Sequence, residues 1–161
     1  MREHNSILEN QELHITNALS LRGKVTQADL QQEVVRIGKF VEDGGYTRTG
    51  STVSVTYAIE QQGTSPILDV ELITPLDKPF IPPQGCICKP IIKLVHAVSI
   101  RHIGNPAGLQ ETVNLLLAYI QKNNFQIITP AYNVSVQEAT MPNMIDQMIV
   151  DVYIGVSPNI L

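Results

Sequence analysis

The sequence contains two similar segments about 79 residues apart, and this internal repeat constrains the fold more than any other feature. Ala18 to Arg22 (ALSLR) recurs as Ala97 to Arg101 (AVSIR), with Ala, Ser and Arg identical and apolar residues at the remaining positions. The similarity continues beyond each segment for the length of a helix. We therefore expect this chain to build one structural unit twice.

Each segment is followed by apolar residues at the spacing that lines one face of an α-helix. They are Leu30, Val34, Ile37 and Val41 in the first copy, and Leu109, Val113, Leu116 and Ile120 in the second. Thr26 followed by Asp29 approximates a capping box, and Asn105 precedes a proline suited to a first helical position. The pairs Gly-Gly at 44–45 and Asn-Asn at 123–124 are able to close the helices.

The apolar period changes to two after each predicted helix, which is typical of half-buried strands. Alternating segments lie at 53–57 and 68–72 in the first copy and at 134–137 and 150–154 in the second. The sequence therefore predicts an α+β fold, a tandem βαββ repeat with pseudo-two-fold symmetry, antiparallel sheets, two long helices and a cleft between the halves.

We expect residues 1–161 to form a single domain, because one βαββ unit leaves the apolar faces of its sheet and helix uncovered. The first copy is expected at about 8–78, the connector at about 79–91 and the second copy at about 92–157. With 43% hydrophobic residues, the chain has enough apolar material for a core.

Charge and hydropathy exclude several classes of protein. The net charge is −4 and no stretch gathers five or six like charges, so direct nucleic-acid binding is not expected. The sequence has no apolar run of secretory or membrane-spanning length, so we expect a cytoplasmic protein without membrane partners. Cys86 and Cys88 are expected to stay reduced, because a disulfide between them would be strained.

No metal or cofactor is expected. Cys86 and Cys88, taken with His96 and His102, do not have the spacing of a zinc site. The segment from Gly104 to Gly108 has neither the lysine nor the spacing of a phosphate-binding loop. No Ser-His-Asp or Cys-His arrangement has a recognisable spacing, so no catalytic residue is assigned.

The second copy resembles the gyrase-inhibitor-like (GyrI-like) family of small-molecule effector-binding domains. The resemblance covers about residues 92–156 and rests on Ala97 to Gly104, Leu109 to Ile120, Pro130 to Val134 and Val150 to Val156. It implies the duplicated fold predicted above. It also implies a carboxylate on the final strand, facing lipophilic cations in an aromatic-lined cleft.

That carboxylate falls on Asp151, where the family usually has glutamate. The family also tends to have tryptophan near the place of Tyr119 and proline at that of Gly155, and this chain has no tryptophan. Strand alternation places Tyr153 on the same face as Asp151. The predicted ligand contacts are Asp151, Tyr153, Tyr119, Tyr132 and, as the counterpart of Asp151 in the first copy, Asp69. The simpler alternative is that the acidic residues line a solvated sheet face and that the tyrosines are core or rim residues.

These observations favour a stand-alone cytoplasmic protein that binds a small apolar molecule, with or without a positive group. One alternative is a protein-interaction module that kept the fold without a working pocket. Another is a hydrolase of small electrophilic compounds in which Asp151 acts with Tyr119 or Tyr132. A protein partner or a homodimer is compatible with the sequence.

Overall fold

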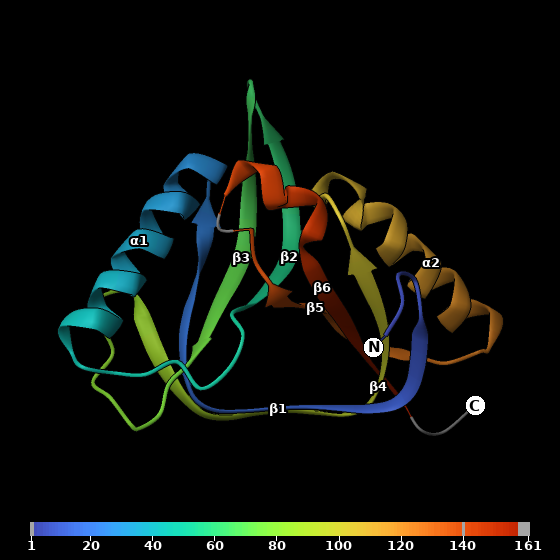
Figure 1. Ribbon diagram of the computed structural model, residues 1–161, viewed down its shortest axis with the longest axis horizontal. Helices are drawn as coiled ribbons and strands as arrows, with labels where there is room; N and C mark the ends of the chain where they lie inside the picture. Colours follow the sequence, from blue (N-terminus) through green and yellow to red (C-terminus); the bar gives the residue numbers. More distant parts are fainter. Residues whose placement is uncertain (1, 140, 158–161) are drawn as a thin grey trace. The chain divides into compact units, whose positions relative to one another are not determined.

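The computed structural model describes residues 2–139 and 141–157 (Figure 1). Its elements are β1 (Ile7–Val25), α1 (Gln27–Asp43), β2 (Val53–Gln62), β3 (Ser65–Pro75), β4 (Cys86–Ile103), the short 3-10 helix η1 (Pro106–Gly108), α2 (Leu109–Lys122), β5 (Ile127–Gln137), the 3-10 helix η2 (Pro142–Gln147) and β6 (Ile149–Val156). The paired strands within each sheet run antiparallel, so the predicted mixed fold with antiparallel sheet is confirmed. In the described ranges, no helix has the length and apolarity needed to cross a membrane.

Contacts between residues divide the chain into two compact units. The first unit is Ile15–Ile92, and the second unit combines Met1–His14 with Lys93–Leu161. β1 and β4 therefore each contribute residues to both units. β4 begins at Cys86, so part of the segment that the sequence predicts as a connector belongs to a strand.

Both helices begin and end close to the places that their caps predict. The Thr26 side chain accepts a hydrogen bond from the Asp29 amide at 3.2 Å, and α1 follows. The Asn105 side chain accepts from the Ala107 amide at 2.9 Å ahead of η1 and α2. Gly45 and Asn124 adopt the left-handed conformation just after the two helices, which closes each one.

The sheet of the first unit has the strand order β1-β3-β2, and α1 lies along it (Figure 1). β1 pairs with β3 from Ala18 opposite Pro75 to Val25 opposite Leu68. The core between helix and sheet consists of residues from β1, α1, β3, the segment after β3 and the first position of β4: Leu19, Leu21, Ile37, Val41, Leu72, Leu76 and Cys86. Burial of this apolar surface is the main force that holds α1 on the sheet.

The sheet of the second unit has the strand order β4-β6-β5, and α2 packs on it. β4 pairs with β6 from Ala97 opposite Gly155 to Ile103 opposite Ile149. The core again joins the first strand, the helix and the last strand of the unit: Val98, Ile100, Leu116, Ile120, Val150, Val152, Ile154 and Val156. The helix side of each sheet is thus apolar. On the opposite, helix-free side of the first sheet, buried apolar residues such as Val53 and Ile73 lie beside the polar residues Ser20 and Glu71.

β1 and β4 each contain a left-handed residue immediately before the paired segment. These residues are Asn17, at φ 48°, and His96, at φ 54°. A left-handed residue interrupts the extended backbone, and asparagine and histidine tolerate this conformation better than most residues do. The alternation of side chains in each paired segment therefore begins directly after the left-handed residue, and the first residues of these segments, Ala18 and Ala97, are 0% exposed.

Candidate functional site

Asp151 lies on the helix-free face of the second unit's sheet and is 5% exposed. Its neighbours in β6, Val150 and Val152, point to the opposite side into the core below α2. Arg101, its register partner in β4, donates from Nε and Nη2 to Oδ1 and Oδ2 at 2.7 and 2.8 Å. Arg2 adds a longer contact, with Nη1 3.5 Å from Oδ2. The carboxylate is therefore buried and already paired.

Positive charge exceeds negative charge around Asp151, because two guanidinium groups face one carboxylate. The hydrogen bond to Asp151 raises the pKa of Arg101 above its ordinary value, since it stabilises the charged form. Arg2 Nε is buried and has no hydrogen-bond partner in the described part of the chain. Arg101 thus has a two-point contact with Asp151, whereas the guanidinium of Arg2 donates mainly to Ser6 and Ser99 and contacts the carboxylate only at the longer distance.

Tyr153 and Tyr132 share the face of Asp151. Tyr153 follows Asp151 by two residues along β6, and Tyr132 in β5 is its register partner. Both tyrosines are half-buried. Burial, together with the negative charge of Asp151, raises the pKa of the Tyr153 hydroxyl, so this group is protonated at neutral pH. The structure brings three of the five predicted site residues onto one face of one sheet.

Tyr119 is not part of this group. It lies on α2, and its hydroxyl donates to Glu9 Oε2 at 2.9 Å. Its ring packs against the apolar cluster on the helix side of the sheet, away from Asp151. The hydrogen bond to Glu9 raises the pKa of Tyr119. The structure thus does not bring together the pair of Asp151 and Tyr119 that a hydrolase reaction would use.

Asp69 does not hold the position in the first unit that the sequence comparison gives it. Arg22, the register partner of Glu71, is the residue of β1 that matches Arg101 in the repeat. The counterpart of Asp151 by strand register is therefore Glu71 rather than Asp69. Asp69 is instead a half-buried residue that accepts two weak hydrogen bonds from Arg22 at 3.4 Å.

Glu71 is the functional candidate that the sequence comparison misses. It is 1% exposed, and its carboxylate accepts hydrogen bonds from Ser20 Oγ at 2.5 Å, Lys89 Nζ at 2.6 Å and Tyr57 Oη at 2.9 Å. Burial alone would raise the pKa of Glu71, but the hydrogen bonds from Lys89, Ser20 and Tyr57 outweigh it and lower the pKa below the ordinary value. Glu71 is consequently ionised and internally neutralised by Lys89.

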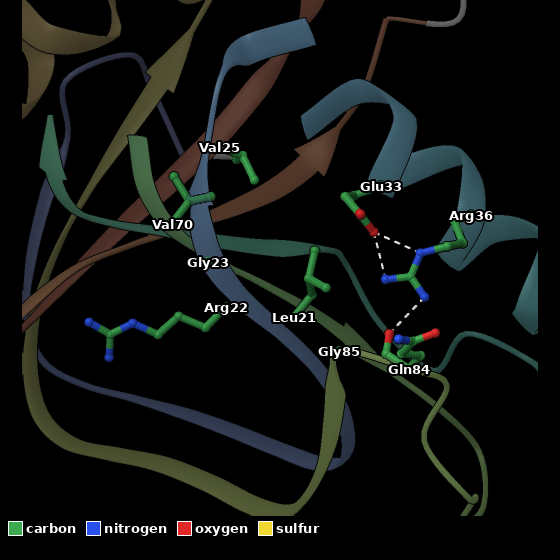
Figure 2. A pocket seen from close by; sticks show the side chains of 9 residues that line it. All are labelled: Leu21, Arg22, Gly23, Val25, Glu33, Arg36, Val70, Gln84 and Gly85. Atoms are coloured by element: carbon green, nitrogen blue, oxygen red, sulfur yellow. Dashed lines mark hydrogen bonds and ion pairs between the residues drawn. The ribbon is translucent and has the colours of Figure 1, made fainter. Parts of the chain in front are cut away.

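The first unit also contains a cavity of about 450 Å³ on the helix side of its sheet (Figure 2). None of the five predicted ligand contacts lines it. Its lining comes from β1, α1, β3 and the segment before β4: Leu21, Arg22, Gly23, Val25, Glu33, Arg36, Val70, Gln84 and Gly85. Figure 2 shows the Arg22 side chain pointing away from α1, so Arg36 supplies the guanidinium on the cavity side.

The cysteines and histidines do not form a metal centre in the described structure. No group of three or more His, Cys, Asp or Glu side chains with the proximity needed to hold a metal ion occurs in the described ranges. Cys86 is buried and Cys88 is half-buried, and both are free thiols. Burial raises the pKa of Cys86 despite the nearby guanidinium of Arg36, so its unreactive thiol form dominates at neutral pH.

No protein-family model matches the sequence, and no curated protein is similar to it. Solved structures do share the fold. The crystal structure of the EcmrR C-terminal domain matches at a TM-score of 0.72 and 16% identity, over 94% of this chain and 96% of that domain. EcmrR in its complex with DNA, determined by cryo-electron microscopy, matches at 0.74 and 15% identity over 94% of this chain.

This chain spans 56% of the EcmrR chain in the DNA complex. The crystal structure of an uncharacterized conserved protein from Listeria innocua matches at a TM-score of 0.62 and 12% identity, over 94% of this chain and 91% of that protein. At such low identities these likenesses establish the fold alone. The chain described here has the fold of the EcmrR C-terminal domain.

Proposed function

We propose that this protein is a small-molecule-binding module of the gyrase-inhibitor-like effector-binding type, built as a tandem βαββ repeat. The shared fold of EcmrR supports the comparison, because the likeness spans 96% of the EcmrR C-terminal domain. The order strand, helix, strand, strand in each unit supports the repeat. The pseudo-two-fold relation and the cleft between the halves stay predictions.

The observation that carries the proposal is the arrangement of Asp151, Tyr153 and Tyr132 on the helix-free face of the second unit. A buried carboxylate beside two half-buried aromatic rings offers an apolar ligand both surface and one strong polar contact. A cation lying over a tyrosine ring would gain about 0.5 to 2 kcal/mol. The ligand class in this proposal is therefore a small aromatic or apolar compound with a positive group.

Arg2 sets the affinity of such a ligand. A cationic ligand must compete with the guanidinium groups that already contact Asp151, and Arg101 makes two short hydrogen bonds whereas Arg2 makes one contact of 3.5 Å. Arg2 is therefore the weaker competitor for the carboxylate itself, although hydrogen bonds to Ser6 and Ser99 also hold its guanidinium. Removing Arg2 should strengthen binding of a cation, and removing the charge of Asp151 should abolish it.

The experiment is a thermal-shift titration with lipophilic ammonium and phosphonium cations, using neutral aromatic compounds of equal size as controls. Cations are expected to raise the Tm of the unmodified protein by mass action. Arg2→Ala should lower the Kd about tenfold, which is about 1.4 kcal/mol. Asp151→Asn should remove the rise in Tm.

Two results would count against the proposal. If no cation shifts the Tm of the Arg2→Ala variant, the interaction-module alternative is favoured. If charged and neutral compounds give equal shifts in both variants, the carboxylate plays no part in recognition. The hydrolase alternative requires turnover of an electrophilic compound, and loss of that turnover in Asp151→Asn would distinguish it from binding.

A further inference from the structure

Gly23 leaves the helix side of the first unit's sheet without a side chain at one position of β1. It pairs with Val70 in β3, and both residues line the cavity beside α1. A Cβ atom built on Gly23 meets no atom within 4 Å. Glycine within a strand commonly marks a place where another group approaches the backbone closely. Here the space in front of the backbone is open.

The second unit fills the corresponding space with an imidazole ring. His102 pairs with Val150 in β6 as Gly23 pairs with Val70, and it is 4% exposed. Its Nδ1 lies 2.7 Å from Thr112 Oγ1 on α2, and its Nε2 lies 2.9 Å from the Asn105 carbonyl oxygen. A planar, hydrogen-bonding ring therefore connects the sheet to the start of the helix in the second unit.

The helix residues match as well. Thr112, which contacts the ring, lies one turn before the buried Leu116, and Glu33 lies one turn before the buried Ile37. Glu33 lines the cavity of the first unit. The first unit thus has a hydrogen-bonding side chain at the place of Thr112, but glycine at the place of the ring.

The cavity has the dimensions and chemistry of a small-molecule site. Its volume of about 450 Å³ lies within the range of roughly 300 to 1,000 Å³ that is usual for ligand pockets. Leu21, Val25 and Val70 give it apolar walls. Glycine at position 23 exposes these walls, since no side chain covers them from β1.

Glu33 offers one free acceptor at this cavity. Arg36 donates to its Oε2 from both Nε, at 2.7 Å, and Nη2, at 2.6 Å (Figure 2). Arg36 Nη1 also donates to the Gln84 carbonyl oxygen at 2.9 Å, which joins α1 to the segment before β4. The second oxygen of Glu33, Oε1, accepts no hydrogen bond from any described residue. The ion pair is thus fixed in place, and one carboxylate oxygen is available to a ligand.

We propose that this cavity is a second small-molecule site, which takes a planar heteroaromatic compound carrying an N–H donor. The ring occupies the space that His102 fills in the second unit and lies against the apolar walls. Its N–H group donates to Glu33. This site is formed by the first unit alone and lies on the helix side of the sheet, so it is independent of the function proposed for the Asp151 face.

The test is an NMR titration of the full chain with benzimidazole, and with 1-methylbenzimidazole, which has no N–H donor. Benzimidazole is expected to give saturable amide shifts at Gly23, Val25 and Gly85, with a Kd of about 1 mM or lower. The methylated compound should bind about five- to tenfold more weakly, because it cannot donate to Glu33.

Gly23→Leu provides the decisive variant, because its side chain enters the open space and should weaken benzimidazole binding at least tenfold. Lys24→Leu is the matched control: it adds the same side chain one residue later, on the opposite face of β1, and should leave the Kd unchanged.

The proposal is overturned if the unmodified protein shows no saturable shifts, if those shifts lie at residues of the second unit, or if Gly23→Leu binds as well as Lys24→Leu. The comparison of the two compounds on the unmodified protein decides the matter if Gly23→Leu does not fold. Equal Kd values for the two compounds would also contradict the assigned hydrogen bond.

Discussion

The two units agree in their apolar residues and differ in their polar ones. Leu19, Leu21 and Ile37 in the first unit have matching buried residues in the second unit: Val98, Ile100 and Leu116. The buried carboxylates differ, because Glu71 is neutralised by an ammonium group and Asp151 by guanidinium groups. The helix side differs as well, since one unit has a glycine where the other has a histidine. The spacing of apolar residues, which the two units share, is therefore what specifies the fold. The polar residues that could bind a ligand differ between the units.

The largest expected change in stability concerns the contact between Arg101 and the buried carboxylate of Asp151 in the second unit. Arg101→Met should lower the free energy of unfolding by about 3 kcal/mol, because it removes the two short hydrogen bonds of a buried carboxylate. The matched control is Arg22→Met in the first unit, where the Arg22 side chain is 52% exposed and lies 3.4 Å from the Asp69 carboxylate. That variant should unfold like the unmodified protein in urea. Equal losses would show that the two arginines do not differ in role.

The second prediction concerns the ring that fills the helix side of the second unit. His102→Gly should lower the free energy of unfolding by about 2 to 3 kcal/mol, because a buried, hydrogen-bonded side chain is removed and a cavity is left. Added imidazole should restore part of the loss by occupying the vacated space, which calorimetry would record as a rise in Tm. The unmodified protein is the control, in which His102 itself excludes imidazole from that place. Imidazole that raises both Tm values equally would contradict the comparison.

The third prediction uses the acidity of Glu71. Its pKa in the folded protein lies below the ordinary value of 4.5, so its contribution to stability is present above that pH and is lost as pH falls through the folded pKa. Glu71→Gln should lower the free energy of unfolding by about 1.5 kcal/mol at pH 7, through loss of the ion pair with Lys89. Urea unfolding of both proteins between pH 7 and pH 3 should show this gap closing in acid. A gap that is constant across this range would show that the carboxylate charge does not stabilise the fold.

The smallest expected effect is a gain in stability. Gly23→Val should raise the free energy of unfolding by about 0.5 kcal/mol, because valine favours a strand and enters open space. Gly155→Val in the second unit is the matched comparison, and there a Cβ atom would lie 2.7 Å from Thr129 Cγ2. That variant should be destabilised. If both variants lowered the free energy of unfolding, the space around Gly23 would not be open in solution.

The elements that local sequence determines are predicted well. The caps at Thr26 and Asn105 depend on side chains that reach their own next residues, so a short stretch of sequence contains all the information. Helix faces are predicted less completely. Val34 fits the apolar spacing of α1, yet it is 44% exposed, because the sheet covers a narrower stripe of the helix than the spacing implies.

The pairing of strands could not be predicted as well. Side chains alternate between the two faces of a strand every two residues. An error of two residues in the predicted strand register therefore leaves every side chain on the correct face, so the apolar pattern does not reveal the error. This explains the confusion of Asp69 with Glu71, which only the pairing of Glu71 with Arg22 resolves. The contact between Arg2 and Ser99 joins residues 97 positions apart, and no local pattern indicates it. The cavity beside α1 depends on Gly23, and the sequence alone does not show that this glycine faces the helix across an open space.

The second unit is assembled from two separate stretches of chain, residues 1–14 and the part from residue 93 onward. No single cut in the polypeptide therefore isolates it complete. A fragment that starts at residue 93 would lack Arg2 and also Glu9, the acceptor for the Tyr119 hydroxyl. Folding of this unit needs residues from both stretches, so it cannot be completed before the stretch that starts at residue 93 has been synthesised.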